Sequence, residues 1–180
     1  PLSVTNINHL WHRGYPSEYI FNKNNVSYEG KVKRKVLVQA DLWDGDPDID
    51  AMARISYRPE VTINNIEEPY CSSNISPFNS QNTFIHRDVL PYYMVIPHIQ
   101  RMDDIWGGYI LQHMFKDCLI YNTPTVYQAR NKHDLVTDLE GELIGLRHTL
   151  NVIGEDYSVI PNNAYESYEI YKEQFLNVTK

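Results

Sequence analysis

Several features that mark common protein classes are missing from this sequence. Its 180 residues include only two cysteines, Cys71 and Cys118, and they lack the Cys-x-x-Cys spacing of zinc ribbons and redox motifs. A disulfide between them stays an open alternative. The sequence also contains neither GxGxxG nor GxxxxGK(S/T), so the chain does not carry a Rossmann or P-loop phosphate cradle of its own.

Long apolar runs are missing too. No stretch approaches the roughly 20 apolar residues of a membrane-spanning helix, and the segment from Pro1 to His12 lacks the basic-then-apolar pattern of a signal peptide. We therefore expect no membrane span in this chain. Because it begins with Pro1 and not with methionine, we also expect a piece of a longer protein. Its compartment stays open between the cytoplasm and a Golgi-associated location.

Basic residues are few. The formal net charge is −7 and the pI is near 5.4, whereas binding to a nucleic-acid backbone normally requires a basic face. The one basic cluster, at residues 31–35, is interrupted and precedes an apolar run, which favours a solvated entry to a strand. We therefore expect no nucleic-acid partner.

What is present predicts one folded domain over residues 1–180. A hydrophobic content of 42% with 12% aromatic residues is enough for a core. Short β-branched and apolar runs predict strands at residues 36–39, 61–64, 82–85 and 125–128.

Helical spacing predicts four helices. The first has Asp46 as its cap and Pro47 as its first residue, with Ile49, Met52 and Ala53 on one face. The second runs from Asp103 to about residue 115. The third carries Leu135, Leu139, Leu143, Leu146 and Leu150 and ends near Gly154, and the last carries Tyr165, Tyr168, Tyr171 and Phe175. Together with the strands they predict a mixed α/β layer structure, with a helical tail over about 134–180.

Five carboxylates lie within ten residues, at Asp41, Asp44, Asp46, Asp48 and Asp50. Oxygen-rich sets of this kind bind Mg²⁺, Mn²⁺ or Ca²⁺. An EF-hand is excluded, because counting from Asp44 places isoleucines where the required Gly and Glu belong. Two interpretations stay open: a helix N-terminus decorated with acids, or a site for a metal, a sugar or a diphosphate group.

A second constellation is Asp103 and Asp104, followed by Trp106, Gly107 and Gly108. Adjacent carboxylates shift each other's pKa values, which suits a general base. The indole and the two glycines predict a groove floor on which a sugar stacks. The alternative is a plain helix cap with a second acid that suits the helix dipole.

A third constellation follows the strand predicted at residues 125–128. Arg130 is a candidate contact for phosphate, and His133 is a candidate contact for phosphate or a metal ligand. The alternative is that both are ordinary surface residues.

Four segments, read in order along the chain, together resemble a known family. They are Arg13-Gly-Tyr-Pro, the run from Leu42 to Ala51, the run from Phe78 to Phe84 with Arg87-Asp88, and the run from Arg101 to Trp106. They resemble blocks of the reversibly glycosylated polypeptides (UDP-arabinopyranose mutases). The second and third are more similar still to the STELLO and DUF288 proteins. The similarity extends from about Trp11 to His133.

The resemblance implies the C-terminal, acceptor-side portion of a GT-A-like nucleotide-diphospho-sugar transferase fold, with a mixed sheet and flanking helices. It implies a glycosyltransferase or nucleotide-sugar-modifying enzyme that uses a UDP-sugar donor, a Mn²⁺ or Mg²⁺ ion, and a carbohydrate or protein acceptor. An N-terminal donor-binding half would be a partner if the chain is a fragment. Asp103 or Asp104 would be the catalytic base. The substrate-binding candidates are Arg13, Asp44, Asp46, Asp48, Asn82, Trp106 and Arg130. The alternative is a non-catalytic carbohydrate-binding or scaffold subunit with the same fold.

Overall fold

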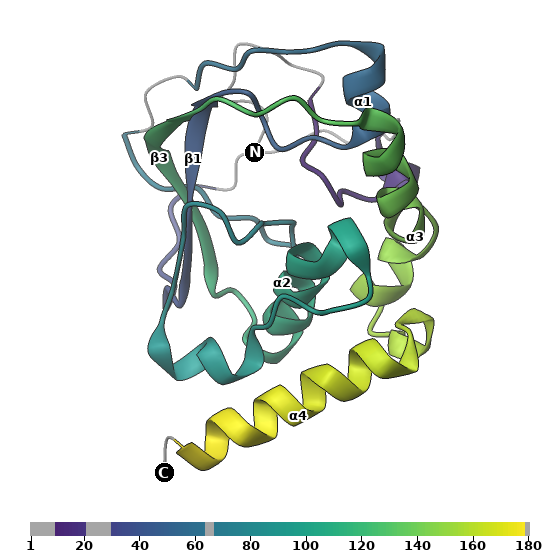
Figure 1. Cartoon of the computed structure of the whole chain (residues 1–180). Coiled ribbons are helices and arrows are strands. Elements are labelled where there is room, and N and C mark those ends of the chain that lie inside the picture. The colour runs from purple at the N-terminus through teal and green to yellow at the C-terminus, as the bar shows by residue number, and fades with distance from the viewer. Residues whose placement is uncertain (1–9, 21–29, 64–66, 179–180) are drawn as a thin grey trace.

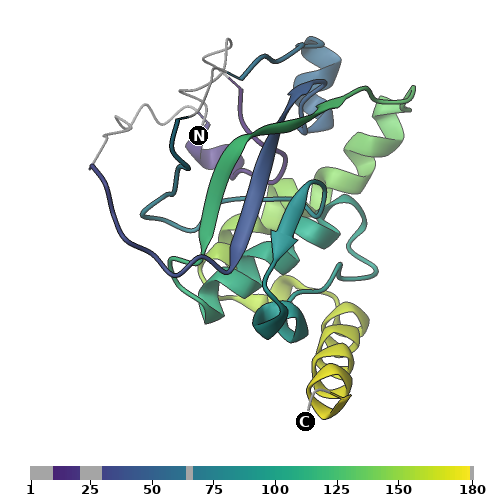
Figure 2. The same cartoon turned by 90° about the vertical axis from the view of Figure 1, so that its left-hand side faces the viewer.

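The computed structural model describes residues 10–20, 30–63 and 67–178. It is a mixed α/β fold in which helices flank a three-stranded mixed sheet. In Figure 1 the sheet lies on one side of α2 (Asp103–Met114), and α3 (Leu135–Ile153) lies on the other. The turned view in Figure 2 shows the strands in front and the helices behind them, so the helices cover one face of the sheet.

The sheet has the order β2-β1-β3. Its central strand, β1 (Val38–Gly45), pairs antiparallel with β2 (Thr83–Ile85) and parallel with β3 (Leu119–Gln128). A parallel neighbour requires a crossover, and α2 lies in the chain segment that supplies it. A shift of register between Asp41 and Trp43 interrupts the β1–β3 ladder.

The strands differ in extent from those that the sequence predicts. The strand predicted at 36–39 begins at Val38 and continues through the acidic segment to Gly45, because the ladder to β3 extends along its whole length. The strand predicted at 125–128 is the end of the longer β3. In the run predicted at 61–64, Val61 makes an isolated bridge with Gly45, and Asn64 lies outside the described residues.

The first helix starts later than predicted. It is α1 (Ala51–Ser56), and its cap is Asp50, whose side chain accepts a hydrogen bond from the backbone N–H of Ala53. Asp46 is engaged with arginines instead, so the prediction of Asp46 as cap and Pro47 as first helical residue was wrong. Met52 is exposed, whereas Ile49 and Ala53 are buried.

Helix α3 forms where the leucine spacing predicts it and ends at Gly154. Its buried face, however, is not the leucine stripe: Leu143 is exposed, and the buried positions include Gly141, Glu142 and Gly145. A methyl group on Gly145 would lie 2.2 Å from the sulfur of Met102, so the small residues let α3 approach the segment before α2 closely. The last helix, α4 (Asn162–Val178), buries Ala164 and Tyr168.

Among the described residues the core has three parts. The largest joins α2 to α3 and α4 and contains Trp106, Tyr109 and Tyr168, all almost fully buried. A second fills the space between α2 and the sheet, and a small third packs around Ile49. Among the described residues no helix is long and apolar enough to cross a membrane. Cys71 and Cys118 are both free thiols, so the structure does not contain the disulfide left open above.

Candidate functional site

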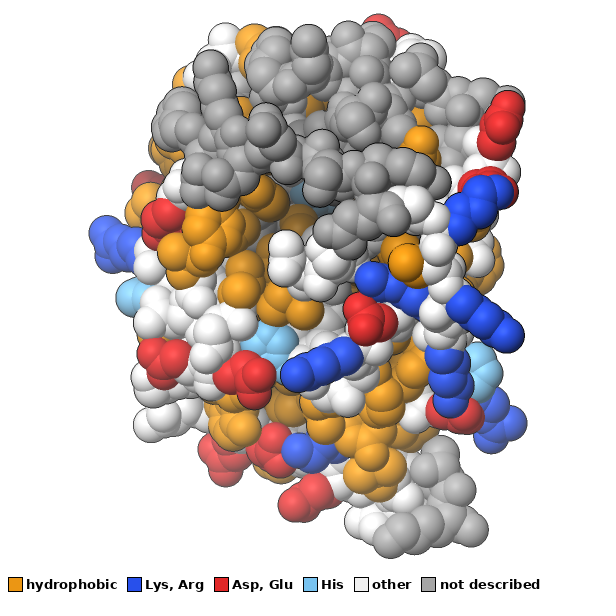
Figure 3. Space-filling model, turned by 180° about the vertical axis from the view of Figure 1, so that it is seen from behind, with side chains coloured by type: hydrophobic (Ala, Val, Ile, Leu, Met, Phe, Trp, Pro, Cys, Tyr) orange, Lys and Arg blue, Asp and Glu red, His pale blue; other side chains and the backbone are white. Residues whose placement is uncertain are grey.

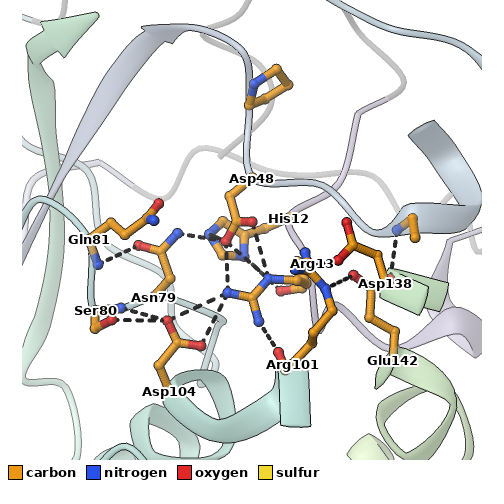
Figure 4. Close-up of polar contacts among 12 residues, drawn as sticks. His12, Arg13, Asp48, Asn79, Ser80, Gln81, Arg101, Asp104, Asp138 and Glu142 are labelled. Atoms are coloured by element: carbon orange, nitrogen blue, oxygen red, sulfur yellow. Dashed lines mark hydrogen bonds and ion pairs between the residues drawn. The ribbon is translucent and has the colours of Figure 1, made fainter. Parts of the chain in front are cut away.

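Arg13 lies at the centre of a buried cluster of polar side chains (Figure 4). Its Nε is 3.1 Å from Oδ1 of Asp48, and its Nη2 is 3.1 Å from Oδ1 of Asp104. Its Nη1 donates to the carbonyl of Arg101. We call the set Arg13, Asp48, Asn79, Ser80 and Asp104 the Arg13 cluster. Four chain segments that are distant in sequence supply it.

Backbone contacts fix the position of Arg13. Its N–H donates to the carbonyl of Asp48 over 2.9 Å, and the next residue, Gly14, has a φ of +75°. A Cβ on Gly14 would lie 2.4 Å from Cγ2 of Ile105, so only glycine fits this turn against α2. The hydroxyl of Tyr109 donates to the carbonyl of Gly14. These contacts orient the Arg13 side chain toward the start of α2.

Asp48 is the anionic centre of the cluster. Besides Arg13, it accepts a hydrogen bond from Nδ2 of Asn79 at 2.6 Å and one from Nη2 of Arg130 at 3.1 Å. Burial would by itself raise the pKa of Asp48. The charge of Arg13, its hydrogen bonds to the carboxylate and the charge of Arg130 outweigh burial and hold that pKa well below its usual range. Asp48 is therefore a carboxylate at every physiological pH.

His12 extends the cluster on one side. Its Nδ1 lies 2.7 Å from the carbonyl of Arg13, which can only accept, so Nδ1 carries the proton. Its Nε2 is 3.9 Å from Oδ2 of Asp48. Burial lowers the pKa of His12 in spite of the nearby Asp48 carboxylate. The imidazole is therefore neutral at pH 7.

Arg130 and Arg54 close the other side. Asp46 lies 2.5 Å from Nη1 of Arg54 and 3.7 Å from Nε of Arg130. Burial lowers the pKa of Arg130, and Asp48 and Asp46 oppose that shift. The guanidiniums of Arg13, Arg54 and Arg130 thus balance the carboxylates of Asp46, Asp48 and Asp104, and the charges are paired within the protein.

The two adjacent acids at the start of α2 have different surroundings. Asp104 is buried, and its carboxylate accepts from Arg13 and from the backbone N–H of Ser80 at 2.8 Å. Asp103 is half-buried, and its Oδ1 accepts from the backbone N–H of Asp104. Burial raises the pKa of Asp103 above its usual value, and the Asp104 carboxylate adds to this rise. Asp103 is the first residue of α2 and not its cap, which is Met102.

A second polar network adjoins the Arg13 cluster. Arg101, whose carbonyl accepts from Arg13, donates through Nε to Glu142 at 2.7 Å and lies 3.1 Å from Asp138. Glu142 is only 1% exposed and also accepts from the N–H of Ala51 at the start of α1. This network ties α1, the segment before α2, and α3 together.

Asp44, Asn82 and His133, also predicted as site residues, make their contacts away from Arg13. Asp44 accepts from the backbone N–H of Ile63. The side-chain amide of Asn82 donates to the carbonyl of Leu42 and to Oγ1 of Thr125, so it bridges β1 and β3. His133 lies 3.0 Å from Asp138, in front of α3.

The predicted groove floor is not formed. Trp106 is fully buried, and its indole N–H donates to Oγ1 of Thr149 at 3.1 Å, so no ring face is available for a sugar. A Cβ on Gly107 would lie 2.2 Å from the carbonyl oxygen of Met94, and one on Gly108 would meet the ring of Phe78. The two glycines allow close packing in the core instead.

Several residues of these networks were not predicted from the sequence, among them His12, Asn79, Ser80 and Glu142. Asn79 and Ser80 lie inside the third family-like block, which was a usable signal. Glu142 stands among the leucines of α3 and gives no local sign that it faces Arg101.

The described acids do not fit a divalent cation. Among residues 10–20, 30–63 and 67–178, no three His, Cys, Asp or Glu side chains come together in a way that would hold a metal ion. Asp46 and Asp48 face arginines, and His133 faces an aspartate that also contacts Arg101. Mn²⁺ or Mg²⁺ binding therefore stays a prediction based on the resemblance alone.

Comparison with known proteins adds no identification. No protein family model matches this chain, and a search of curated proteins finds no match.

Proposed function

We propose that this chain is the acceptor-side part of a GT-A-type glycosyltransferase, in which an acid at the start of α2 accepts the proton of an acceptor hydroxyl. The single observation that carries the proposal is the difference between Asp103 and Asp104. Adjacent carboxylates with separate environments are the arrangement that provides one structural acid and one titratable base.

Asp103 suits the role of base better than Asp104. The Asp104 carboxylate is buried, and both of its oxygens accept hydrogen bonds from Arg13 or Ser80. Asp103 is half-buried, and a raised pKa makes its carboxylate a stronger base. The sequence pattern indicates Asp104 first, with Asp103 as its alternative, whereas the contacts favour Asp103.

The reaction follows from the resemblance. The oxygen of the acceptor hydroxyl would form a bond to the anomeric carbon of the UDP-sugar as its proton passes to Asp103. The bond between that carbon and the diphosphate oxygen would break, and UDP would leave with the electron pair. The chain's own contribution would be the base and the fixed geometry of the Arg13 cluster. No step is assigned to a metal, since the described acids do not fit one.

The paired charges of the Arg13 cluster favour a second candidate function, a non-catalytic carbohydrate-binding or scaffold subunit. The side chains form ion pairs with one another, and Trp106 is in the core; the pairs join Arg13, Arg54 and Arg130 to Asp46, Asp48 and Asp104. Such a subunit would keep the fold and bind glycans without releasing UDP.

The test compares three variants in the full-length protein: Asp103→Asn, Asp104→Asn and, as a matched control, the exposed Asp88→Asn. UDP release from a panel of UDP-sugars is measured with and without acceptors. We expect Asp103→Asn to lose roughly 10²–10⁴-fold in rate at an unchanged melting temperature. Asp104→Asn should also lower the melting temperature. Asp88→Asn should match the wild type in both rate and melting temperature.

Two outcomes would contradict the proposal. Wild-type turnover in Asp103→Asn would exclude this residue as the base. Glycan binding with no UDP release from any donor would favour the non-catalytic subunit.

A further inference from the structure

A cavity of about 280 Å³ lies at the C-terminal end of α2, away from the Arg13 cluster. Its wall includes residues 72–76, Gln112 and His113 at the end of α2, residues 116–119 that lead into β3, and the end of α3. At about 1.5 Å per helical residue, Gln112 lies roughly 12 Å along α2 from Asp104. We call this cavity the α2 cavity. It shares no lining residue with the Arg13 cluster.

One wall of the α2 cavity is held in place by buried hydrogen bonds. The amide of Gln112, 4% exposed, accepts from the N–H of Ser76 at 3.1 Å and donates to its carbonyl at 2.8 Å. The hydroxyl of Tyr121 lies 2.9 Å from Oγ of Ser76 and 2.6 Å from the carbonyl of Pro77. Because these contacts fix the loop, the cavity is preformed, and a ligand would not have to order it.

The charges that line the cavity balance. Arg34 and Asp117 form an ion pair of 3.2 Å, and the remaining charged side chains, Lys116 and Glu155, are of opposite sign. Burial lowers the pKa of His113, whose Nδ1 lies 2.9 Å from the hydroxyl of Tyr157, so this imidazole is neutral at pH 7. Figure 3 shows acidic and basic side chains interspersed over the described part of one face of the molecule. A balanced lining favours a neutral ligand over a phosphate or carboxylate.

The lining also mixes hydrogen-bonding groups with apolar ones. Ser73 and Asn74 are exposed at the loop, and the N–H of Asn74 donates to Oγ of Ser72. Ile75, Leu119 and Ile153 supply apolar surface. Hydroxyl and amide groups beside apolar patches match a sugar ring, which has both hydroxyls and C–H faces. The volume lies just below the roughly 300–1,000 Å³ of drug-sized ligand sites, which suits a ligand of about one ring.

We propose that the α2 cavity binds one ring of a neutral glycan, as a carbohydrate site separate from Asp103 and Asp104. This binding goes beyond the proposed catalysis and does not depend on it. The site holds a glycan at the opposite end of α2 from the acids.

The experiment is a titration of the ¹⁵N-labelled chain, followed by amide chemical shifts, with the methyl glycosides of glucose, galactose, mannose and arabinopyranose. Inorganic phosphate is titrated in parallel. We expect saturable shifts at residues 72–76 and 112–119 with at least one glycoside. Ser73→Ala and Asn74→Ala should each weaken that binding about threefold to tenfold, because each removes a hydrogen bond. Both residues are exposed, so both variants should retain the wild-type spectrum elsewhere.

Asp88→Asn is the matched control and should bind as the wild type does. Asp103→Asn should also retain this binding, which separates a failure of the cavity from a failure of the base. Three results would overturn the proposal: saturable shifts with phosphate but with no glycoside, glycoside binding that Ser73→Ala and Asn74→Ala leave unchanged, and no saturable shifts at all.

Discussion

Arg13 and Asp104 are 91 positions apart in the sequence and form a buried ion pair, with 3.1 Å between Nη2 and Oδ1. The same guanidinium contacts Asp48 and the carbonyl of Arg101. One side chain therefore joins the N-terminal turn, the segment before α1 and the start of α2. Burial would lower the pKa of Arg13, but the two carboxylates raise it, so the pair stays charged.

Replacement of Arg13 should destabilise the fold strongly. Arg13→Gln leaves Asp48 and Asp104 buried without their main cation, and loss of one partner of a buried ion pair typically costs about 3–5 kcal/mol. Urea denaturation measures this loss, and Arg58→Gln, at an exposed arginine, is the control. A free energy of unfolding within about 0.5 kcal/mol of the wild type would show that the network contributes little to stability.

Asp48 should make stability depend on acid pH in a defined direction. Its pKa is lower in the folded than in the unfolded chain, so its contribution is complete well above pH 4 and falls as the pH drops below about 3.9. At pH 3 the unfolded carboxyl has gained most of its proton, which removes about 1 kcal/mol of this contribution. The stability gap between wild type and Asp48→Asn should therefore be smaller at pH 3 than at pH 7. An equal or larger gap at pH 3 would contradict the assignment.

Trp106 should behave as a core residue. Trp106→Ala removes a fully buried ring and the hydrogen bond to Thr149, and truncation of a buried Trp costs about 3–5 kcal/mol. Trp43→Ala, at a partly exposed position on β1, should cost less. The expected readouts are thermal unfolding and a blue-shifted Trp106 fluorescence maximum in a variant that lacks both Trp11 and Trp43. A stable Trp106→Ala protein with impaired glycan binding would contradict this prediction and would indicate that a sugar stacks on Trp106 after all.

We expect even one added methyl group at Gly107 to destabilise the fold. Alanine normally stabilises a helix interior relative to glycine by about 1 kcal/mol. Here its Cβ would lie 2.2 Å from a backbone oxygen of Met94, which cannot move away as a side chain can. Gly107→Ala should therefore lower the melting temperature. As a control, alanine at the unobstructed Gly30 should be tolerated better, although its φ of +93° adds some strain. A rise in melting temperature for Gly107→Ala would show that the helix contact is looser than described.

We expect the 180-residue chain to bind UDP weakly or not at all. Asp46 and Asp48 are paired with arginines, so a metal-bound diphosphate would first have to displace these partners. Calorimetric titration of UDP with Mn²⁺ should show no binding tighter than millimolar. Micromolar binding would contradict this, and its loss in Asp44→Asn or Asp46→Asn would then identify these acids as metal ligands.

Local patterns in the sequence determined most of the elements. Leucines at helical spacing predict α3, and the β-branched run before the acidic segment predicts β1, since both signals depend on neighbours within a few residues. Arg13, Asp48 and Asp104 all lie in the segments that resemble the family, so the sequence also indicates them as site candidates. The α/β class was therefore available from sequence alone.

Only the tertiary structure decided what these residues do. Whether Asp104 or Asp103 keeps an available carboxylate depends on Arg13, 91 positions from Asp104 in the sequence, and on Ser80. Whether Trp106 faces a groove or the core depends on Thr149 in a later helix. A sequence pattern reports spacing along the chain, whereas burial and charge pairing are set by which distant segments pack together. For that reason the sequence predicts which acids are site candidates, but it does not predict their burial or their ion-pair partners.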